Sequence, residues 1–316
     1  MKILVTGAAG FIGSHLTDLL LKRRDSVIGI DNFDPFYDIA IKEKNIEHAL
    51  SYHSFSLHRT DICDYQAISD IIQREKPEIV VHIAAKAGVR PSILDPHGYY
   101  RTNVEGTINL LECCKRFEIN KFILASTSSI YGNNKKVPFA ENDPVEFPIS
   151  PYAASKKSAE LFCHTYHHLY GIQIYALRFF TVYGPRQRPD LAIHKFFSLL
   201  QQGKPIPIYG DGTTCRDYTY IDDILQGVIR SIDRVSGFEI INLGESKTTK
   251  LNDLVRLIEE IAGGPVTKEF FPLQPGDVKQ TYADIDKARK LLNYDPQTEM
   301  KDGLLKFYEW FSNSKS

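Results

Sequence analysis

Short β-rich runs alternate with longer helical patterns through the first 180 residues, and this alternation constrains the fold more than any other feature. Strands that alternate with helices pair in parallel through crossover connections. The run at 78–84 is apolar almost throughout, as expected when helices cover both faces of a sheet. The six runs are KILVT (2–6), SVIGID (26–31), SFSLHRTD (54–61), EIVVHIA (78–84), KFILAST (121–127) and IQIYALRF (172–179).

After residue 180 the rhythm becomes irregular. A proline-rich tract is followed by one more strand, helix and strand in residues 217–244, and then by charged helical segments. We therefore predict an α/β fold, a Rossmann-type doubly wound parallel sheet with a smaller, mainly C-terminal substrate-binding lobe. The larger domain should comprise residues 1–180 plus about 217–244, and the lobe residues 181–216 and 245–316.

The composition excludes several kinds of partner. Across 316 residues, 38 Lys and Arg balance 39 Asp and Glu, so no overall charge draws the chain to nucleic acid or to an anionic membrane. No segment approaches the roughly 20 apolar residues of a membrane span. The five cysteines form no CxxC pair and the ten histidines have no metal-ligand spacing. We expect no metal site, no disulfide framework and a cytoplasmic location.

Three glycines separate the first strand from a helical pattern. Gly7 can form the tight turn, Gly10 can let the backbone approach a pyrophosphate, and Gly13 can let the helix pack on the strand. The positive end of the helix dipole would then face the phosphates. The alternative is a tight turn without a ligand.

The second and third strands end in carboxylates. Asp31 can accept hydrogen bonds from both ribose hydroxyls and would repel a 2′-phosphate, which favours NAD over NADP. Asp61, with Ile62, would border the adenine. The alternatives are that Asp31 caps a loop and that Asp61 caps a turn.

SPYAASKKSAE places Tyr152 and Lys156 one helical turn apart on the same face. A nearby ammonium and the positive nicotinamide of NAD⁺ favour the tyrosine phenolate, which makes it a general base for an alcohol. Ser126 and Thr127 end the fifth strand, where open α/β sheets place ligands, and one of these hydroxyls can share the substrate proton. The alternative is a surface helix beside loop-capping hydroxyls.

Together with these features, seven motifs resemble the nucleotide-sugar epimerase group of the extended short-chain dehydrogenases/reductases, and UDP-glucuronate 4-epimerases above all. The resemblance implies a catalytic triad of Thr127, Tyr152 and Lys156, with NAD bound throughout the cycle. It also implies cofactor contacts from Phe11, Ile12, Asn32, Ala84, Ala85, Lys86, Asn103 and Phe179. The motifs are GAAGFIG, DN, HIAAKAG, STSSIYG, SPYAASK, LRFFTVYGPRQRP and RDYTYIDD.

The resemblance extends to the nucleotide. It implies that Arg216 binds the diphosphate, that Asp277 lies near the nucleoside ribose and that Tyr209 packs on uracil. Asp277 follows Gly276. Some members of the family carry a further arginine shortly before this Gly-Asp pair. Here the stretch reads Leu273-Gln274-Pro275, which leaves the second phosphate cation unassigned.

Two features indicate the sugar. Uronate epimerases resemble this chain in having threonine at Thr181, where relatives acting on neutral sugars have asparagine, and Arg188 can pair with a sugar carboxylate. Alternatively, Arg186 and Arg188 form a solvated basic loop or contact phosphate. Ser128 and Ser129 stand where related dehydratases carry acidic residues, and serines serve poorly as the acid and base of elimination.

The sequence therefore predicts NAD-dependent C4 epimerisation of a UDP-sugar, UDP-glucuronate to UDP-galacturonate. A 4-epimerase of UDP-glucose or UDP-N-acetylglucosamine is the alternative within the same class. A non-catalytic NAD-binding sensor is the rival from another class, although a sensor has no need of the triad. The resemblance also implies a homodimer that pairs through residues 96–116 and 152–170.

Overall fold

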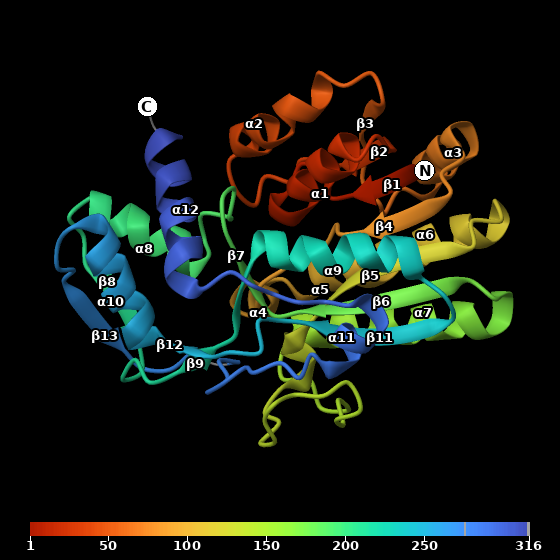
Figure 1. Cartoon of the computed structure of the whole chain (residues 1–316). Coiled ribbons are helices and arrows are strands. Elements are labelled where there is room, and N and C mark those ends of the chain that lie inside the picture. Colours follow the sequence, from red (N-terminus) through yellow and green to blue (C-terminus); the bar gives the residue numbers. More distant parts are fainter. Residues whose placement is uncertain (275, 315–316) are drawn as a thin grey trace.

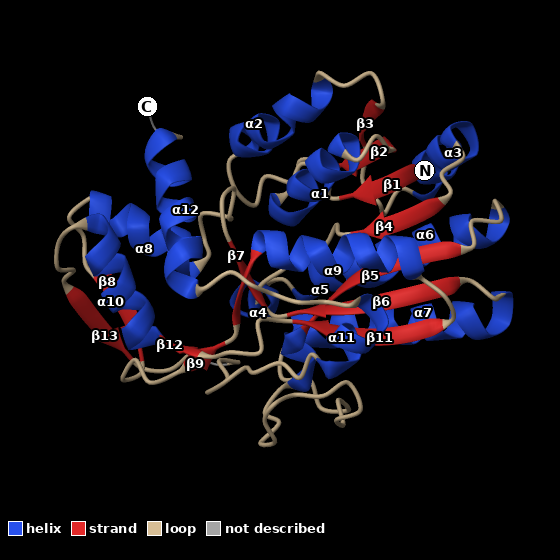
Figure 2. Cartoon of the chain, viewed as in Figure 1, coloured by secondary structure: helices blue, strands red, loops and turns tan. Residues whose placement is uncertain are grey.

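The computed structural model describes residues 1–274 and 276–314 and contains a seven-stranded parallel sheet (Figures 1 and 2). The sheet order is β11-β6-β5-β4-β1-β2-β3, so the chain reverses direction across the sheet between β1 and β4. The predicted doubly wound sheet is confirmed with the six predicted N-terminal strands and the strand near residue 240 in it, whereas the strand predicted at the start of 217–244, β10 (Tyr218–Tyr220), pairs with β7 (Thr181–Tyr183) outside this sheet. The strands are β1 (Lys2–Thr6), β2 (Ser26–Asp31), β3 (Phe55–Arg59), β4 (Ile79–His82), β5 (Lys121–Thr127), β6 (Gln173–Phe179) and β11 (Phe238–Leu243).

Helices cover both faces of this sheet because successive strand side chains point to opposite sides. In β1, Ile3 and Val5 pack into one hydrophobic core with α1, α2 and α9, and Leu4 packs into the other with α3, α6 and α7. The helices are α1 (Phe11–Lys22), α2 (Ile39–Leu50), α3 (Tyr65–Glu75), α4 (Val89–Leu94), α5 (Pro96–Tyr100), α6 (Gly106–Arg116), α7 (Pro151–Tyr170) and α9 (Ile221–Arg234), with a π-helical turn η1 (Arg101–Glu105) and a 3₁₀ turn η2 (Ser128–Tyr131).

The rest of the chain builds a smaller lobe beside the carboxyl ends of the strands (Figure 1). Its short strands pair β7 with β10, β9 with β12 and β8 with β13, so segments far apart in the sequence lie together. The domain boundaries stay a prediction, since α11 packs back on α9 and β11. The elements are β7 (Thr181–Tyr183), α8 (Ala192–Gln201), β8 (Ile206–Tyr209), β9 (Cys215–Arg216), β10 (Tyr218–Tyr220), β12 (Thr249–Lys250), α10 (Leu251–Ala262), β13 (Lys268–Phe271), α11 (Asp286–Leu292) and α12 (Met300–Asn313).

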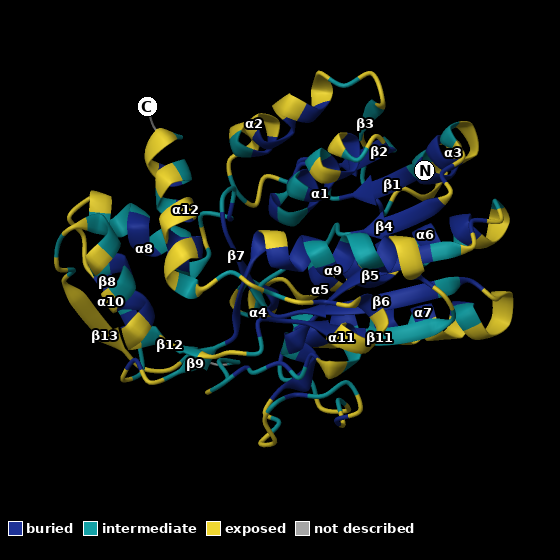
Figure 3. Ribbon diagram, viewed as in Figure 1, coloured by how far each residue is buried: buried dark blue, intermediate teal, exposed yellow. Residues whose placement is uncertain are grey.

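Burial follows this arrangement. Figure 3 shows the central strands buried, whereas the outer faces of the helices and the lobe strand β13 are exposed. Within the residues that the structure describes, no helix combines the length and the apolar character needed to cross a bilayer.

A buried carboxylate, Asp217, joins the lobe to the sheet. It is fully buried and accepts hydrogen bonds from the backbone N–H groups of Glu245 (2.8 Å), Ser246 (3.1 Å) and Ala283 (3.0 Å). Each hydrogen bond to a charged group contributes about 1.5–3 kcal/mol relative to its loss. Asp217 therefore fixes the segment that carries Arg216 against the chain leaving β11.

The turn between β1 and α1 leaves no room for a Cβ at Gly7 or Gly13. Gly7 has a φ of +71°, and a Cβ on Gly13 would lie 1.9 Å from the Gly7 carbonyl oxygen. Gly13 thus lets α1 pack directly on the turn, as its spacing predicted.

We expect Gly13→Ala to destabilise the protein by about 1–3 kcal/mol, because the backbone of α1 must move away from Gly7. Gly264→Ala is the matched control: a Cβ there meets nothing within 4 Å. Urea unfolding of both variants measures the difference. If Gly13→Ala unfolds like the control, the close contact does not hold the turn together.

Candidate active site

A cavity of about 460 Å³ opens at the carboxyl ends of β1, β2, β4, β5 and β6. This is where an open α/β sheet binds ligands, at the point where the strand order reverses. Most of the predicted site residues line this cavity. They are Gly7, Gly10, Phe11, Ile12, Gly13, Asp31, Asn32, Asp61, Ile62, Ala84, Ala85, Lys86, Ser126, Thr127, Tyr152, Lys156, Phe179, Thr181 and Arg188.

A second cavity of about 450 Å³ adjoins the first. Phe36, Gly88, Pro91 and Leu191 line both cavities. The second is also lined by the three residues predicted to bind the nucleotide, Tyr209, Arg216 and Asp277. The two cavities together can hold two ligands that meet near Phe36.

Asp31 ends β2 and is buried beside the glycine-rich turn. Its carboxylate accepts hydrogen bonds from the N–H groups of Ala9 (3.0 Å) and Phe33 (2.8 Å). The Lys42 ammonium lies 3.8 Å from Asp31 Oδ1. This geometry leaves carboxylate lone pairs for ribose hydroxyls, while Lys42 offsets part of the negative charge.

Lys42 was missed by the sequence analysis. It lies on the buried face of α2, one turn before Ile46, and a lysine at a core-facing position was the available signal. From the same face, Asn45 donates to the Ala9 carbonyl at 3.2 Å. Helix α2 therefore supports both Asp31 and the glycine-rich turn.

Asp61 lies across from Asn32, whose amide donates to it at 3.2 Å. Although burial alone would raise the pKa of Asp61, hydrogen bonds from Cys63 and Asn32 hold it below its usual value. The carboxylate is therefore charged and links the ends of β2 and β3.

Asn103 does not line either cavity. From the π-helical turn η1 it donates to Lys86 O and Ser155 Oγ, both at 2.9 Å, and accepts from Lys86 N at 2.9 Å. It holds the loop after β4 against α7 from behind the cavity wall. Asn103 thus supports Lys86, which lines the first cavity, and its own cofactor contact stays a prediction.

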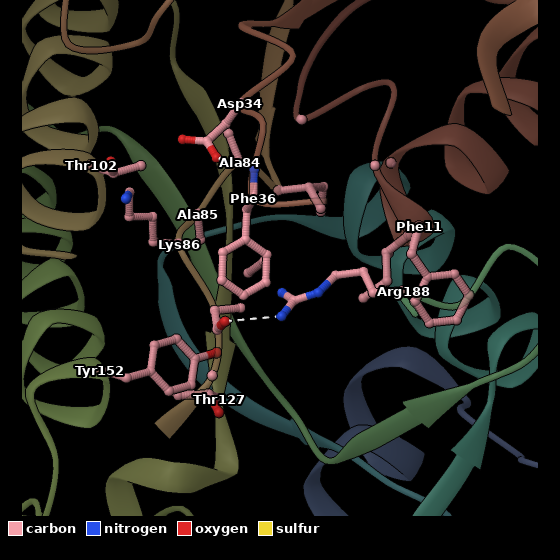
Figure 4. Close-up of a pocket in the computed structure, with 18 of the residues that line it drawn as sticks. Phe11, Asp34, Phe36, Ala84, Ala85, Lys86, Thr102, Thr127, Tyr152 and Arg188 are labelled. Carbon is pink, nitrogen blue, oxygen red and sulfur yellow. Dashed lines mark hydrogen bonds between the residues drawn. The ribbon is translucent and has the colours of Figure 1, made fainter. Parts of the chain in front are cut away.

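Tyr152 and Lys156 project from the first turns of α7. Ser150 caps this helix by accepting from Ala153 N at 3.1 Å, which sets the direction in which Tyr152 leaves the helix. Figure 4 shows the Tyr152 side chain directed toward Thr127 at the end of β5. The three members of the predicted triad thus meet in the cavity.

The charges around Tyr152 differ from the sequence-based expectation. Burial raises the pKa of Tyr152, and the hydrogen bond with Thr127 and the charge of Arg188 oppose this rise. Burial also lowers the pKa of Lys156 to about 8. The Lys156 ammonium donates to the Ala125 carbonyl at 2.8 Å, and Arg188 is the cation whose charge lowers the pKa of Tyr152.

The two strand-end hydroxyls point to different partners. Ser126 donates to Glu160 Oε1 at 2.6 Å, so its proton is directed away from the cavity. Thr127 Oγ1 lies 3.2 Å from Ser129 Oγ and accepts from Ser129 N at 3.1 Å. Thr127 is therefore the hydroxyl that faces Tyr152, and Ser126 belongs to the layer behind it.

Arg188 reaches the cavity from the loop after β7. Its guanidinium forks onto Asp190, with distances of 2.9 Å and 2.7 Å, and donates to the Ala87 carbonyl at 3.1 Å. The Phe36 ring centre lies 5.0 Å from it (Figure 4). Thr181, at the start of β7, lines the same cavity. A planar cation of this kind suits a carboxylate ligand.

Arg186 lies elsewhere. Its guanidinium pairs with Asp18 of α1 at 2.8 Å, and it lines neither cavity. The structure separates the two neighbouring arginines because Arg186 has a left-handed φ of +62°, which turns the chain between them. The predicted substrate contact of Arg186 is not supported by this placement.

Arg90 organises the second cavity and was missed by the sequence analysis. It pairs with Asp277 at 2.8 Å, and its guanidinium lies 4.1 Å from the Tyr209 ring centre. Arg90 and Lys195 accompany Arg216 in the cavity wall and supply cations for a diphosphate. The sequence analysis found no second phosphate cation in the stretch Leu273-Gln274-Pro275. Leu273 lines this wall, and Pro275 lies outside the described residues.

Over residues 1–274 and 276–314, no group of three or more His, Cys, Asp or Glu side chains could hold a metal ion.

Comparison with known proteins agrees with this site. The family model described as GDP-mannose 4,6 dehydratase matches residues 4–307. A UDP-glucuronate 4-epimerase of Thermodesulfobacterium geofontis is 44% identical over 308 residues, covering 97% of this chain and 95% of that protein. UDP-glucuronate 4-epimerase 4 of Arabidopsis thaliana is 39% identical and covers 98% of this chain and 75% of its own length.

Solved structures extend the comparison. UDP-glucuronic acid 4-epimerase from Bacillus cereus, in complex with UDP-glucuronic acid and NAD, superposes with a TM-score of 0.94 at 41% identity, covering 99% of this chain and 100% of that one. UDP-glucose 4-epimerase from Thermotoga maritima, with UDP-glucose, has a TM-score of 0.92 at 32% identity and covers 100% of both chains. The resemblance predicted from the motifs is confirmed: this chain belongs to the GDP-mannose 4,6-dehydratase family of nucleotide-sugar enzymes, beside its UDP-glucuronate 4-epimerases.

Proposed function

We propose that this protein is an NAD-dependent epimerase that inverts C4 of UDP-glucuronate to give UDP-galacturonate. One observation carries the proposal: Arg188, a cation suited to a carboxylate, faces the same cavity as Tyr152 and Thr127. The similarity to the Bacillus cereus enzyme, whose structure holds UDP-glucuronic acid and NAD, supports it.

The residues of the first cavity fit NAD. A Cβ at Gly7 or Gly13 would collide with backbone, so the turn packs closely there, and the start of α1 lines the cavity, where its backbone N–H groups suit a pyrophosphate. Asp31 and Lys42 suit an adenosine ribose with free hydroxyls, and Asp61 and Ile62 border the adenine side. Bound there, NAD supplies a reversible hydride acceptor for the sugar C4.

The triad transfers the proton of the sugar 4-hydroxyl. In the proposed mechanism Tyr152 takes the proton of the 4-hydroxyl as a general base, and Thr127 holds that oxygen in line with it. Lys156 and Arg188 stabilise the negative charge that Tyr152 carries as a phenolate. The 4-keto sugar then rotates about its diphosphate link and is reduced on its other face, while Tyr152 returns the proton.

The second cavity anchors the nucleotide during this rotation. Arg216, with Arg90 and Lys195 beside it, holds the diphosphate, Tyr209 packs on the uracil and Asp277 lies near the ribose. Because these contacts involve the nucleotide rather than the sugar, they stay intact while the sugar turns. Ser128 and Ser129 provide neither the acid nor the base that elimination needs.

The carboxylate must also be restrained. Oxidation at C4 gives a β-keto acid, which loses CO₂ readily when its carboxylate bond stands perpendicular to the carbonyl plane. Thr181 and Arg188 hold the carboxylate by one hydrogen bond and one charge-assisted pair. The same contacts select a uronate over a neutral sugar.

Incubation of the purified protein with UDP-glucuronate, without added cofactor, should yield UDP-galacturonate and no net NADH, since the hydride returns to the sugar.

Tyr152→Phe keeps the ring but removes the base, so turnover should fall by roughly 10²-fold or more. Product analysis and absorbance at the NADH band measure both. Stoichiometric NADH release would instead identify a dehydrogenase, and an active Tyr152→Phe would exclude the mechanism.

Arg188→Ala should lower kcat/KM for both sugars, because Arg188 also acts on Tyr152, and should lower it for UDP-glucuronate by roughly 1.5–3 kcal/mol more than for UDP-glucose, because only the uronate loses a charged hydrogen bond. A 4-keto-pentose by-product should rise. Arg186→Ala is the matched control, since Arg186 pairs with Asp18 outside the cavities. Equal losses for both sugars would exclude a contact of Arg188 with the sugar carboxylate and leave it with Tyr152 or the diphosphate, and a wild type that prefers UDP-glucose would favour the neutral-sugar alternative.

We also propose a homodimer that pairs through α5, α6 and α7. Large apolar side chains are exposed on α5 and α7: Tyr100 is 60%, Leu161 57% and Leu169 59% exposed. Light scattering should give twice the 36.0 kDa of one chain, and a mass of one chain would exclude the dimer.

The cytoplasmic location stays a proposal too, based on five free thiols, and cell fractionation tests it.

A further inference from the structure

Three buried polar side chains form a layer directly behind the triad. Ser126 on β5, Glu160 on α7 and Arg178 on β6 are 3%, 1% and 1% exposed. Arg178 forks onto Glu160 with Nε–Oε1 and Nη2–Oε2 distances of 2.9 Å each, and Ser126 donates to the same carboxylate at 2.6 Å. One carboxylate thus joins two strands to one helix.

This layer lies one residue away from the reacting groups. Ser126 pairs in register with Arg178, and the next pair along, Thr127 and Phe179, lines the cavity. One turn earlier on α7, Lys156 donates to the carbonyl of Ala125, the residue before Ser126. Helix α7 is therefore tied to two successive residues of β5 immediately before Thr127.

The charges of this layer are unequal. Lys156 and Arg178 are buried cations, Lys157 lies 3.6 Å from Glu160 Oε2, and Glu160 is the shared anion. Burial lowers the pKa of Lys156, and Cys163 and Glu160 oppose that fall. The titratable and charged groups that face the Tyr152–Lys156 pair are Glu160, Cys163 and Lys157 on α7, His82 on β4, Tyr99 on α5, Arg178 on β6 and Arg188 after β7.

Arg178 is held from a third side. Its guanidinium lies 4.9 Å from the Tyr131 ring centre, and the Tyr131 hydroxyl donates to Asn242 of β11 at 2.7 Å. The fork therefore has little freedom to move. A buried ion pair of this kind contributes little net stability compared with an apolar pair of the same size, so its stability alone does not account for it.

We propose that Glu160 is a positioning residue for the reaction. Held by Ser126 and Arg178, it fixes the end of β5, and with it Thr127, against Tyr152 and Lys156. The inference rests on the proposed function only in taking Thr127, Tyr152 and Lys156 as the reacting set; the placement of Glu160 is independent of the sugar.

Glu160→Gln tests the charge and Glu160→Asp tests the reach. In Glu160→Gln, kcat should fall about 10- to 100-fold with KM near wild type, as for a small misplacement of reacting groups. Removing a negative charge lowers the pKa of neighbouring groups, so the limbs of the pH–kcat profile that belong to the Tyr152–Lys156 pair should move to lower pH. Glu160→Asp keeps the charge, so kcat should fall while the limbs stay in place.

A double variant guards against misfolding of Glu160→Gln. Glu160→Met with Arg178→Met removes both buried charges together, which often leaves a folded protein. This double variant should keep the wild-type unfolding temperature and should have a reduced kcat. Its pH–kcat profile should shift less than that of Glu160→Gln, because one charge of each sign is gone. Asp25→Asn is the control: Asp25 is a buried, paired carboxylate just before β2, at the far end of the sheet.

The control should lower the unfolding temperature without moving kcat or the pH profile. A folded Glu160→Gln that retains bound NAD and shows wild-type kcat and pH profile would overturn the proposal. All variants are measured on whichever UDP-sugar the wild type epimerises. A wild type that prefers a neutral sugar contradicts the uronate assignment without affecting the Glu160 comparison, so the two failures are distinguishable.

Discussion

Parallel hydrogen bonding between neighbouring strands is the constraint on which the site depends. Because β1, β2, β4, β5 and β6 run in the same direction, their carboxyl ends meet at one edge of the sheet. The register between β5 and β6 then sets Thr127 beside Phe179, and the crossover through α7 returns Tyr152 to the same edge. A slip of one residue in β5 would exchange Thr127 with Ser126 and turn the catalytic hydroxyl to the opposite face.

The second constraint is electrostatic. The cavity wall and the layer behind it hold several cations, and desolvation makes each of them costly unless an anion lies close by. Glu160 accompanies Arg178 and Asp190 accompanies Arg188, with all four contacts of the two forks at 2.7–2.9 Å. Burial therefore strengthens the fields that act on Tyr152 while the paired carboxylates keep the cations in fixed orientations.

The lobe adds the nucleotide half of the site by long-range pairing. β8 pairs with β13, and Arg90 from the sheet domain reaches Asp277 and Tyr209 of the lobe. Phe36 lies where the two cavities meet, over the guanidinium of Arg188. The cofactor and nucleotide cavities are thus parts of one continuous cleft, whose walls come from segments throughout the chain.

The local periodicity of the sequence determined the strands of the large sheet, the helices between them, the glycine-rich turn and the pairing of Tyr152 with Lys156, because each depends on residues only a few positions apart. The motif resemblance added the family and the triad member Thr127.

The partners of individual side chains were not predictable in this way. Ser126 and Thr127 are adjacent hydroxyls in the sequence, and only the register with Arg178 and the approach of Glu160 decide which one faces the cavity. Arg186 and Arg188 are two residues apart, yet Asp18 and Asp190 draw them in different directions. Lys42 has only its core-facing position as a signal in the sequence and Arg90 has none, whereas packing of α2 and of the lobe places them in the walls of the cavities. Local geometry is encoded by neighbours in the chain, and the orientation of a polar side chain is decided by whichever distant partner satisfies it when both are buried.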